Sequence, residues 1–258
     1  MIANYHTHTV RCLHAQDTDE AYVQSAIAGG LQILGFSDHT PQWFPGDYYS
    51  YMRMRPEELE DYVRSIKDLK KKYASDIELH MGVEAEYYPV CFQRVVEELK
   101  NSGIEYMILG QHWLGNEEGE PYCGKPTMEE CVLQRYCDQV IAGIETGYFT
   151  YIAHPDIIRF EGEDKIYDRH IRRLCRSANA NGVAMEINLL GIRGNRHYPT
   201  EHFWRIAGEE GCTVVLGSDA HKACDICNAQ AEQAALELVK KYGLDLQETL
   251  MLKDICKI

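Results

Sequence analysis

The sequence alternates between short runs rich in β-forming residues and longer segments whose apolar residues recur three and four positions apart. The short runs lie at 2–6, 32–39, 77–86, 106–112, 150–156, 183–189 and 213–221. The longer segments predict amphipathic helices at about 18–29, 55–73, 90–101, 127–147, 168–181, 200–210 and 226–242. Such alternation is typical of parallel strands joined by right-handed crossovers. It predicts an α/β fold, either an open doubly wound sheet or a barrel of seven βα units, and periodicity does not choose between them.

Two of the helices carry end signals that fix where they start. Pro56 suits the first position of the helix in 55–73, because proline has no N–H to donate there. Thr127 and Glu130 match a capping box, and Gly147 suits the other end of that helix. We therefore expect the helix in 127–147 to start at Thr127.

Length and charge restrict the class of protein. A chain of 258 residues fits one domain, and no linker or low-complexity segment divides residues 1–258. The formal net charge of -14 argues against nucleic acid and anionic membranes as partners. No run approaches the ~18 to 20 apolar residues of a membrane span, and the N-terminus lacks the pattern of a signal peptide. We expect a cytoplasmic protein with reduced cysteines, in which the Cys224-x-x-Cys227 pair is incidental.

An aromatic segment at 40–54, "TPQWFPGDYYSYMRM", follows the second predicted strand. It is expected to form a long loop, which is either a hydrophobic flap packed on the body or a lid over a ligand.

Histidines and carboxylates stand at one end of almost every predicted strand. An isolated His-x-His pair such as His6 and His8 is most often a surface feature, so the other strands decide its meaning. The residues at these strand ends are His6, His8, Asp38, His39, Glu84, His112, His154, Asp219 and His221. Because the carboxyl ends of parallel strands share one rim, we expect these side chains to converge.

Imidazole and carboxylate ligands favour zinc, iron or manganese over calcium and magnesium. A closed structural zinc site needs only four ligands, and the strand ends offer more than one ion can use. The sequence therefore predicts a catalytic metal cluster with open positions for water and substrate. His80, His170 and His202 lie outside this pattern and are expected to be ordinary surface or core residues.

The ordered motifs "HTHTVRCLH", "GFSDH", "GVEAEY", "GQH", "AHPD" and "GSDAH" resemble the polymerase and histidinol phosphatase (PHP) superfamily, most closely its histidinol-phosphatase branch. The resemblance spans residues 6–221 and implies a distorted seven-stranded (β/α)7 barrel with up to three divalent transition metal ions. It implies three ligand groups: His6, His8, Glu84 and Asp219; Glu84, as a bridge, with His112 and His154; and His14, His39 and His221.

The same resemblance implies a catalytic water or hydroxide that bridges metals held by Glu84 and Asp219. It also assigns phosphate binding to Arg159, after "AHPDII", and to Arg193, after a glycine in "MEINLLGIRGNRHYP". Both arginines could instead be surface residues. Asp17 is a weak candidate for the general acid, since capping of the nearby helix explains an aspartate there equally well.

The implied activity is hydrolysis of a small phosphate monoester, L-histidinol phosphate, in histidine biosynthesis. An alternative is another small phosphate monoester, such as a nucleotide or sugar phosphate. A nucleic-acid-processing PHP module is disfavoured by the lack of a basic stripe, and a regulatory protein with an inactive cluster is disfavoured by the complete ligand set. The sequence does not indicate the number of subunits.

Overall fold

The computed structural model describes residues 1–258 and contains one parallel sheet of eight strands in the order β1 to β8. The strands are β1 (Ala3–Asn4), β2 (Ile33–His39), β3 (Glu78–Ala85), β4 (Tyr106–Leu109), β5 (Phe149–Ile152), β6 (Ala184–Asn188), β7 (Thr213–Gly217) and β8 (Asp245–Leu246). Every strand pairs in parallel with the next one along the chain. The α/β class predicted from the alternation is confirmed.

The predicted number of strands, seven, is wrong. The additional strand, β8, is formed by Asp245 and Leu246, which pair with Thr213 and Val214 at the start of β7. A two-residue strand is too short to show alternation of apolar and polar residues, so periodicity could not reveal it.

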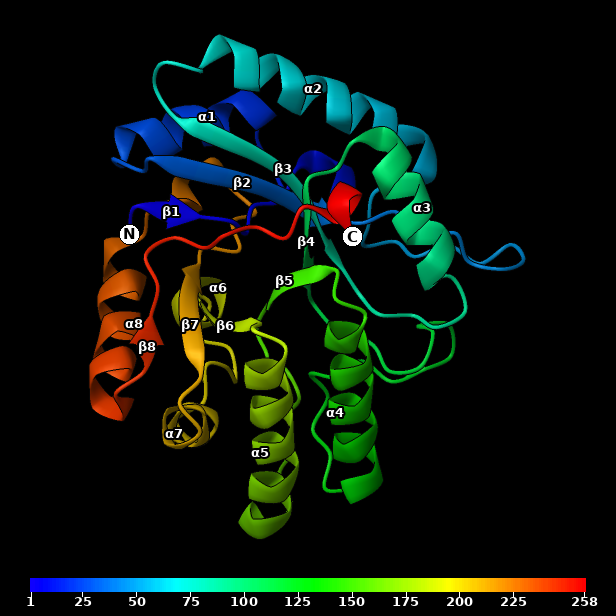
Figure 1. The fold of residues 1–258 in the computed structure, drawn as a ribbon, viewed down its shortest axis with the longest axis vertical. Coiled ribbons are helices and arrows are strands. Elements are labelled where there is room, and N and C mark those ends of the chain that lie inside the picture. Colours follow the sequence, from blue (N-terminus) through cyan, green and yellow to red (C-terminus); the bar gives the residue numbers. More distant parts are fainter.

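Eight α-helices follow or separate the strands, and the longer ones lie on the outside of the sheet (Figure 1). They are α1 (Asp19–Ala28), α2 (Leu59–Lys72), α3 (Phe92–Ser102), α4 (Glu130–Glu145), α5 (Asp164–Ala180), α6 (Leu189–Arg193), α7 (Glu201–Glu209) and α8 (Ala229–Tyr242). The short α6 was not predicted, because five residues are too few to show helical periodicity.

The two predicted helix starts have different outcomes. Pro56 opens a 3-10 turn (Pro56–Glu58) that leads directly into α2, so its predicted position is confirmed. The capping box at Thr127 is wrong, because α4 begins at Glu130. Thr127 lies in extended backbone, where its N–H donates to the Arg159 carbonyl and its own carbonyl accepts from Glu161. This pairing removes Thr127 from the helix.

The carboxyl ends of the strands lie around a common centre. The Ala220 carbonyl, just after β7, accepts a hydrogen bond of 3.0 Å from the His8 N–H, just after β1. Thr7 and Ala220 also form a parallel bridge. The segments that follow the first and the seventh strand are therefore neighbours, and we call the ring of strand ends that they complete the rim.

Side chains on the two faces of the curved sheet pack into separate layers. In β4, Met107 and Leu109 join the large core between sheet and helices, whereas Tyr106 and Ile108 join a smaller cluster on the other face. The smaller cluster also includes Tyr151 and Val215 from other strands and Tyr5 from just after β1, and it fills the inside of the curve. This alternation follows the two-residue period of a strand.

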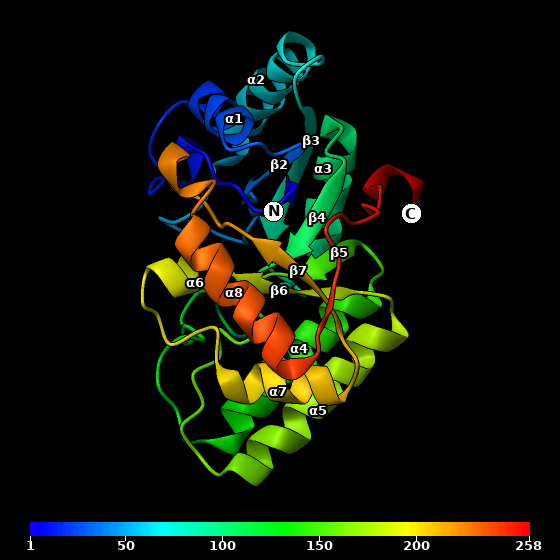
Figure 2. The same ribbon diagram turned by 90° about the vertical axis from the view of Figure 1, so that its left-hand side faces the viewer.

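The C-terminal segment crosses the end of the sheet opposite to the rim (Figures 1 and 2). The Ile255 N–H donates to the carbonyl of Glu105, just before β4, and the Lys253 N–H donates to Thr150 in β5. Ile255 is fully buried there. The tail therefore covers the end of the sheet at which the strands begin.

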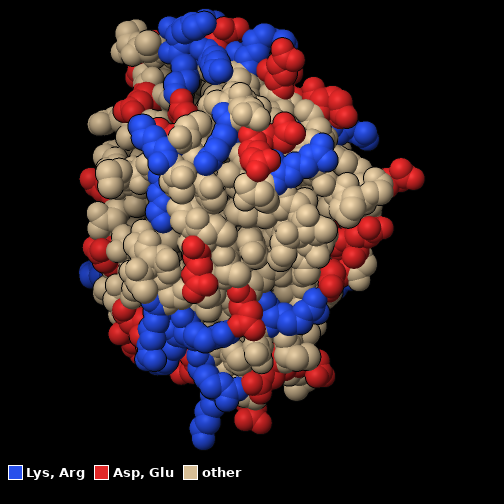
Figure 3. Space-filling view, turned by 45° about the vertical axis from the view of Figure 1, so that its right-hand side comes forward, with Lys and Arg blue, Asp and Glu red and all other residues tan.

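The surface charge, the character of the helices and the state of the cysteines can be read from the structure. On the face in Figure 3, basic side chains lie among acidic ones around a broad area without charged residues. No helix has the length and apolar character needed to cross a membrane. All ten cysteines are free, and Cys224 and Cys227 are exposed.

Tyr106 allows the inner layer to be tested. Its side chain is fully buried, and its hydroxyl donates to the carbonyls of Tyr5 at 2.8 Å and Phe36 at 3.1 Å. Tyr106→Phe leaves these carbonyls without that donor, so we expect the free energy of unfolding to fall by about 1–3 kcal/mol. Chemical denaturation measures this loss. Tyr242→Phe, whose hydroxyl bonds Glu201 at the surface, is the control and should change stability little; equal losses would contradict the assignment.

Candidate metal centre

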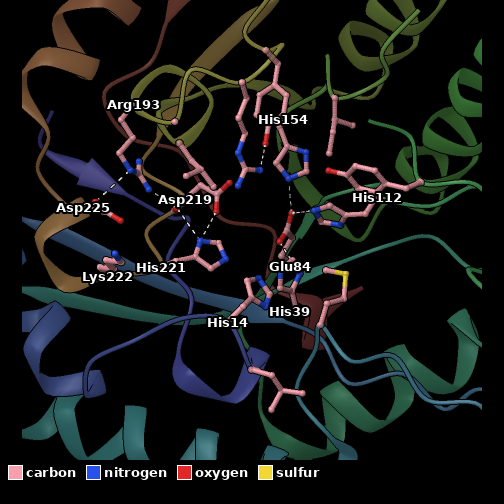
Figure 4. A pocket seen from close by; sticks show the side chains of 18 of the residues that line it. His14, His39, Glu84, His112, His154, Arg193, Asp219, His221, Lys222 and Asp225 are labelled. Atoms are coloured by element: carbon pink, nitrogen blue, oxygen red, sulfur yellow. Dashed lines mark hydrogen bonds and ion pairs between the residues drawn. The ribbon is translucent and has the colours of Figure 1, made fainter. Parts of the chain in front are cut away.

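The structure brings the predicted metal-ligating histidines and carboxylates together at the rim, where all but the fully buried His6 and His8 line one cavity (Figure 4). We call this group the rim cluster; it consists of His6, His8, His14, His39, Glu84, His112, His154, Asp219 and His221. All except His14 and His221 are buried. Strand β2 supplies His39 and strand β3 supplies Glu84, while the remaining residues follow strand ends. Residues far apart in the sequence thus converge, as expected of parallel strands.

The first ligand group surrounds a point between the ends of β1, β3 and β7. The Nε2 atoms of His6 and His8 face each other at 3.1 Å, and each lies 3.5 Å from Glu84 Oε2. Asp219 Oδ1 lies 3.7 Å from His6 Nε2 and 3.2 Å from His8 Nε2. Two ligand atoms on one tetrahedral ion with bonds of about 2.1 Å are about 3.4 Å apart. The spacing therefore fits a metal ion.

The other oxygen of Glu84 belongs to a second group. Glu84 Oε1 lies 2.8 Å from His154 Nε2 and 3.6 Å from His112 Nε2. The two carboxylate oxygens thus face different histidines, which is the arrangement required of a bridging ligand. His14, His39 and His221 form the third group, with one ring nitrogen of each within 4.8 Å of the others.

Several atoms in the cluster have no hydrogen-bond partner although they are buried. They are His39 Nδ1, Glu84 Oε2, His154 Nδ1, Asp219 Oδ1 and His221 Nε2. A buried polar atom without a partner is costly, and most buried polar groups in proteins are satisfied. A cluster of unsatisfied nitrogen and carboxylate atoms fits divalent transition metals, because these atom types are their ligands.

The two carboxylates favour positive charge between them. Burial acts to raise the pKa of Glu84, but His112, His39 and His6 hold that pKa well below its usual range. Burial acts to lower the pKa of His6, but Glu186, Asp219 and Glu84 raise it to about 10. These opposed shifts mark a place where a cation is stabilised.

The imidazoles of the third group are in a different environment. Burial holds the pKa of His39 and of His221 well below the usual value, and His8 lowers both further. Burial and His8 also lower the pKa of His14. Neutral imidazoles have a free lone pair, which is the form that binds metal.

A second set of carboxylates orients the histidines from behind. Glu186, fully buried in β6, lies 2.7 Å from His6 Nδ1 and accepts a hydrogen bond of 3.0 Å from the His154 N–H. Glu86 lies 2.9 Å from His112 Nδ1. An acceptor at Nδ1 fixes the tautomer whose Nε2 faces the cluster. Glu86 and Glu186 were missed by the sequence analysis, although a glutamate within an apolar strand is itself an unusual signal.

The backbone near the cluster leaves room for these carboxylates. A Cβ at Gly110 would lie 1.8 Å from Glu84 Oε1, and a Cβ at Gly217 would lie 1.7 Å from Glu186 Oε1. His154 and Asp219 have positive φ values of 31° and 45°, a conformation that is unfavourable for residues other than glycine. Such strain persists where the surroundings impose it, and here it falls on two of the predicted ligands.

The cavity around the cluster has a volume of about 1100 Å³. Its wall contains residues that the sequence analysis did not select: aromatic Trp113, Tyr122 and Tyr198, and basic Lys125, Arg196 and Lys222. Tyr51 and Met52, from the aromatic loop at 40–54, also line it, so this loop forms part of the wall. Arg196 donates to the Tyr198 hydroxyl at 2.8 Å and, like both lysines, has no carboxylate partner.

The two predicted arginines have different positions. Arg193 lines the cavity, and its guanidinium donates to the carbonyls of Ser218 and Asp219 while Nε lies 3.4 Å from Asp225 (Figure 4). The structure does not bring Arg159 to the cavity wall; its side chain is 44% exposed and pairs with Glu161. Sequence position alone could not show that the segment after His154 turns away.

Asp17 is not placed at the cluster either. It does not line the cavity, and its carboxylate accepts a hydrogen bond of 2.9 Å from the Ala223 N–H. It does not cap the helix, because Thr18 is the N-cap of α1. Asp17 instead links the segment before α1 to the segment after β7.

The parallel β/α fold and the rim cluster together define a protein with a cluster of potential metal ligands at the carboxyl ends of its strands. The family model of the PHP domain matches residues 4–189, and the chain belongs to this family. The family predicted from the motifs is thereby confirmed.

Relatives along most of the chain have related descriptions. A Deinococcus radiodurans protein described as a "probable histidinol-phosphatase" is 28% identical over 234 residues, covering 87% of this chain and 88% of that protein. The histidinol-phosphatase of Bacillus subtilis is 24% identical over 264 residues, covering 90% and 97%. A solved structure of histidinol phosphate phosphatase from Lactococcus lactis, complexed with zinc, L-histidinol and phosphate, is similar in fold, with a TM-score of 0.73, 19% identity and 96% coverage of both chains.

Glu186 provides a test of the site that does not remove a ligand. Glu186→Gln keeps the shape of the side chain but weakens the acceptor facing His6 Nδ1, so we expect about 10- to 100-fold weaker metal binding. Titration of metal-free protein with Zn²⁺ measures the affinity. Glu130→Gln, in the surface pair with Arg169, is the control and should bind as the unmodified protein does. Unchanged affinity in Glu186→Gln would remove Glu186 from the site.

Proposed function

We propose that this protein is a metal-dependent phosphate monoester hydrolase that converts L-histidinol phosphate to L-histidinol and phosphate in histidine biosynthesis. The observation that carries the proposal is the rim cluster, in which imidazoles surround two buried carboxylates at the bottom of a large cavity. The substrate is inferred from the similarity to proteins described as histidinol-phosphatases.

Three groups in the rim cluster would hold up to three ions of zinc, iron or manganese. The first is His6, His8, Glu84 and Asp219; the second is Glu84, His112 and His154; the third is His14, His39 and His221. Bound divalent ions supply a water of lowered pKa and a Lewis acid for phosphate oxygens. In this proposal Glu84 and Asp219 position that water, and no side chain is needed as a nucleophile.

The remaining wall of the cavity supports a phosphate ligand. Lys125, Arg196 and Lys222 line the cavity without carboxylate partners, although the chain has 40 acidic residues against 26 basic ones. These cations add positive charge to the cavity wall, which would attract a phosphate dianion to an otherwise acidic protein. Figure 4 shows Lys222 beside His221 and Asp225, on the wall opposite to His112.

Arg193 acts in this proposal on the turn that carries Asp219. Its guanidinium holds the carbonyls of Ser218 and Asp219 together, and Asp219 has the positive φ value noted above. The planar guanidinium of arginine can donate hydrogen bonds to two oxygens at a fixed spacing, whereas the ammonium of lysine is a compact point charge. Because Arg193 also lines the cavity, we retain phosphate binding as its second proposed role.

We further propose that residues 1–258 work as a single catalytic domain in which the curved sheet forms a distorted β/α barrel. We place the protein in the cytoplasm, as expected from the sequence, and its substrate is a small molecule and not nucleic acid. The net charge of -14 supports the last point.

A comparison of substrates tests the proposed activity. With Zn²⁺ or Mn²⁺ present, kcat/KM for L-histidinol phosphate should exceed that for a sugar phosphate, a nucleoside monophosphate and phosphoserine by at least about tenfold. A chelator should abolish the activity, and added metal should restore it. Equal or faster hydrolysis of another ester would favour the alternative small-molecule phosphatase, and no hydrolysis by the metal-loaded protein would contradict both.

Arg193 yields a separate prediction. Arg193→Lys should lower kcat/KM by about ten- to a hundredfold, because lysine cannot hold both carbonyls of the Asp219 turn and still bind a phosphate oxygen. Arg159→Lys is the matched control, since Arg159 lies outside the cavity, and it should keep the kinetics of the unmodified enzyme. Steady-state kinetics at matched metal content measure both. The assignment is wrong if the two variants behave alike.

A further inference from the structure

Arg53 is the only arginine whose side chain is fully buried, and it lies behind the cavity wall. It belongs to the aromatic loop between β2 and α2, next to Tyr51 and Met52, which line the cavity. Arg53 itself has an exposed fraction of 0% and does not line the cavity, so it cannot touch a substrate there. Burial of a guanidinium is unfavourable unless it is fully paired, which calls for an explanation of its position.

Two carboxylates from different segments pair with Arg53. Its Nη1 donates to Glu86 Oε2 at 2.8 Å and its Nη2 to Glu86 Oε1 at 3.1 Å, which is a bidentate pair. Its Nη2 also donates to Glu117, which follows β4. We call Arg53, Glu86 and Glu117 the Arg53 cluster. All three side chains are at most 3% exposed.

The Arg53 cluster contacts the second ligand group directly. Glu86 Oε1, which accepts from Arg53, also lies 2.9 Å from His112 Nδ1. The Arg53 guanidinium bonds both oxygens of Glu86 and so fixes the orientation of this carboxylate. Glu86 Oε1 can then accept a hydrogen bond from the N–H at His112 Nδ1. His112 is then held in the tautomer whose Nε2 faces Glu84 Oε1 at 3.6 Å.

The aromatic loop also contacts the third ligand group. The Met54 N–H donates to the His39 carbonyl, and Arg53 Nη1 lies 3.4 Å from the carbonyl of Thr40, the next residue. The two ends of the loop are therefore joined beside a predicted ligand. One buried arginine thus links His112 to the backbone at His39.

Glu117 has further hydrogen bonds that hold its carboxylate in place. Tyr88 and Tyr48 donate their hydroxyls to its two oxygens at 2.9 and 3.0 Å. Its backbone has a φ of 73°, a strained value for a residue other than glycine. Glu117 lies five residues after His112, so its capture by Arg53 also anchors the segment that carries His112.

We propose that Arg53 is a positioning residue for the metal centre, which orients His112 through Glu86 and fixes the aromatic loop as a wall of the cavity. The inference rests on the proposed metal-binding function of the rim cluster. It assigns the aromatic loop a structural role in metal binding, in addition to covering the cavity.

Arg53→Lys tests this role because it keeps the charge but loses the bidentate fork. Metal-free protein is titrated with Zn²⁺ by calorimetry, and His112→Ala identifies the binding step that depends on His112. Arg53→Lys should weaken that same step by about 10- to 100-fold and leave the other steps unchanged. Arg172→Lys is the matched control, because Arg172 also pairs with two carboxylates, Glu209 and Glu210, but lies away from the cavity.

Thermal unfolding separates positioning from a general loss of stability. Binding of Zn²⁺ should raise the unfolding temperature of Arg53→Lys less than that of the unmodified protein, since at a given Zn²⁺ concentration a weaker-binding ligand stabilises the folded state less. A purely structural role would lower the metal-free and metal-bound values equally, and that result would overturn the proposal. Should Arg53→Lys not fold, Glu117→Gln tests the other contact of Arg53, because it weakens the anchor on the segment that carries His112 while keeping the Arg53–Glu86 pair. It is also expected to show a smaller increase than the unmodified protein.

The outcomes also distinguish this proposal from the proposed function. An unmodified protein that binds no Zn²⁺ would contradict the metal centre itself. Normal binding by the unmodified protein, with all steps unchanged in a folded Arg53→Lys variant, would contradict only the role of Arg53.

Discussion

The carboxylates of Glu84 and Asp219 are buried near one another at the carboxyl ends of β3 and β7, and the site is organised around their negative charge. Two such charges are unfavourable in a protein interior unless positive charge lies between or around them. Imidazoles from several strand ends surround them, and Glu186, together with Asp219 and Glu84, raises the pKa of His6 to about 10. Divalent metal ions would satisfy the same requirement with more charge and with directed bonds.

Residues behind the rim cluster hold its ligands in position. Glu186 and Glu86 orient histidines from behind, and Arg53 in turn holds Glu86 through a bidentate pair. On the opposite side, Arg193 holds the backbone that presents Asp219. The cavity is therefore built in layers, in which each charged group is fixed by the next group behind it. The cations without carboxylate partners line the same cavity, where they would attract an anionic substrate.

Much of this arrangement could be predicted because strand periodicity places the strand ends. Once 32–39 and 77–86 are recognised as parallel strands, His39 and Glu84 must lie at the same edge of the sheet. The fold class and the family followed from these positions, whereas the number of strands did not, because β8 has only two residues. The start of α4 was wrong because Thr127 pairs with the segment at Phe160, a contact between distant residues that local sequence does not encode.

The second layer of the site could not be predicted for a similar reason. Arg53 looks like a solvent-exposed residue in a loop, and only its contacts with Glu86 and Glu117 show that it is buried. Arg159 and Arg193 each follow a strand end, yet one pairs with Glu161 at the surface and the other lines the cavity. The paths of the loops decide these positions, and loops have no periodicity from which a path could be derived.

Anomalous X-ray diffraction from crystals grown with Zn²⁺, recorded on both sides of the zinc absorption edge, tests the central claim most directly. The account predicts anomalous peaks inside the rim cluster, with Glu84 contacting two of them through its separate oxygens and Asp219 contacting one. Peaks confined to surface residues such as Cys224 and Cys227, or a rim cluster free of zinc at saturating concentration, would contradict it.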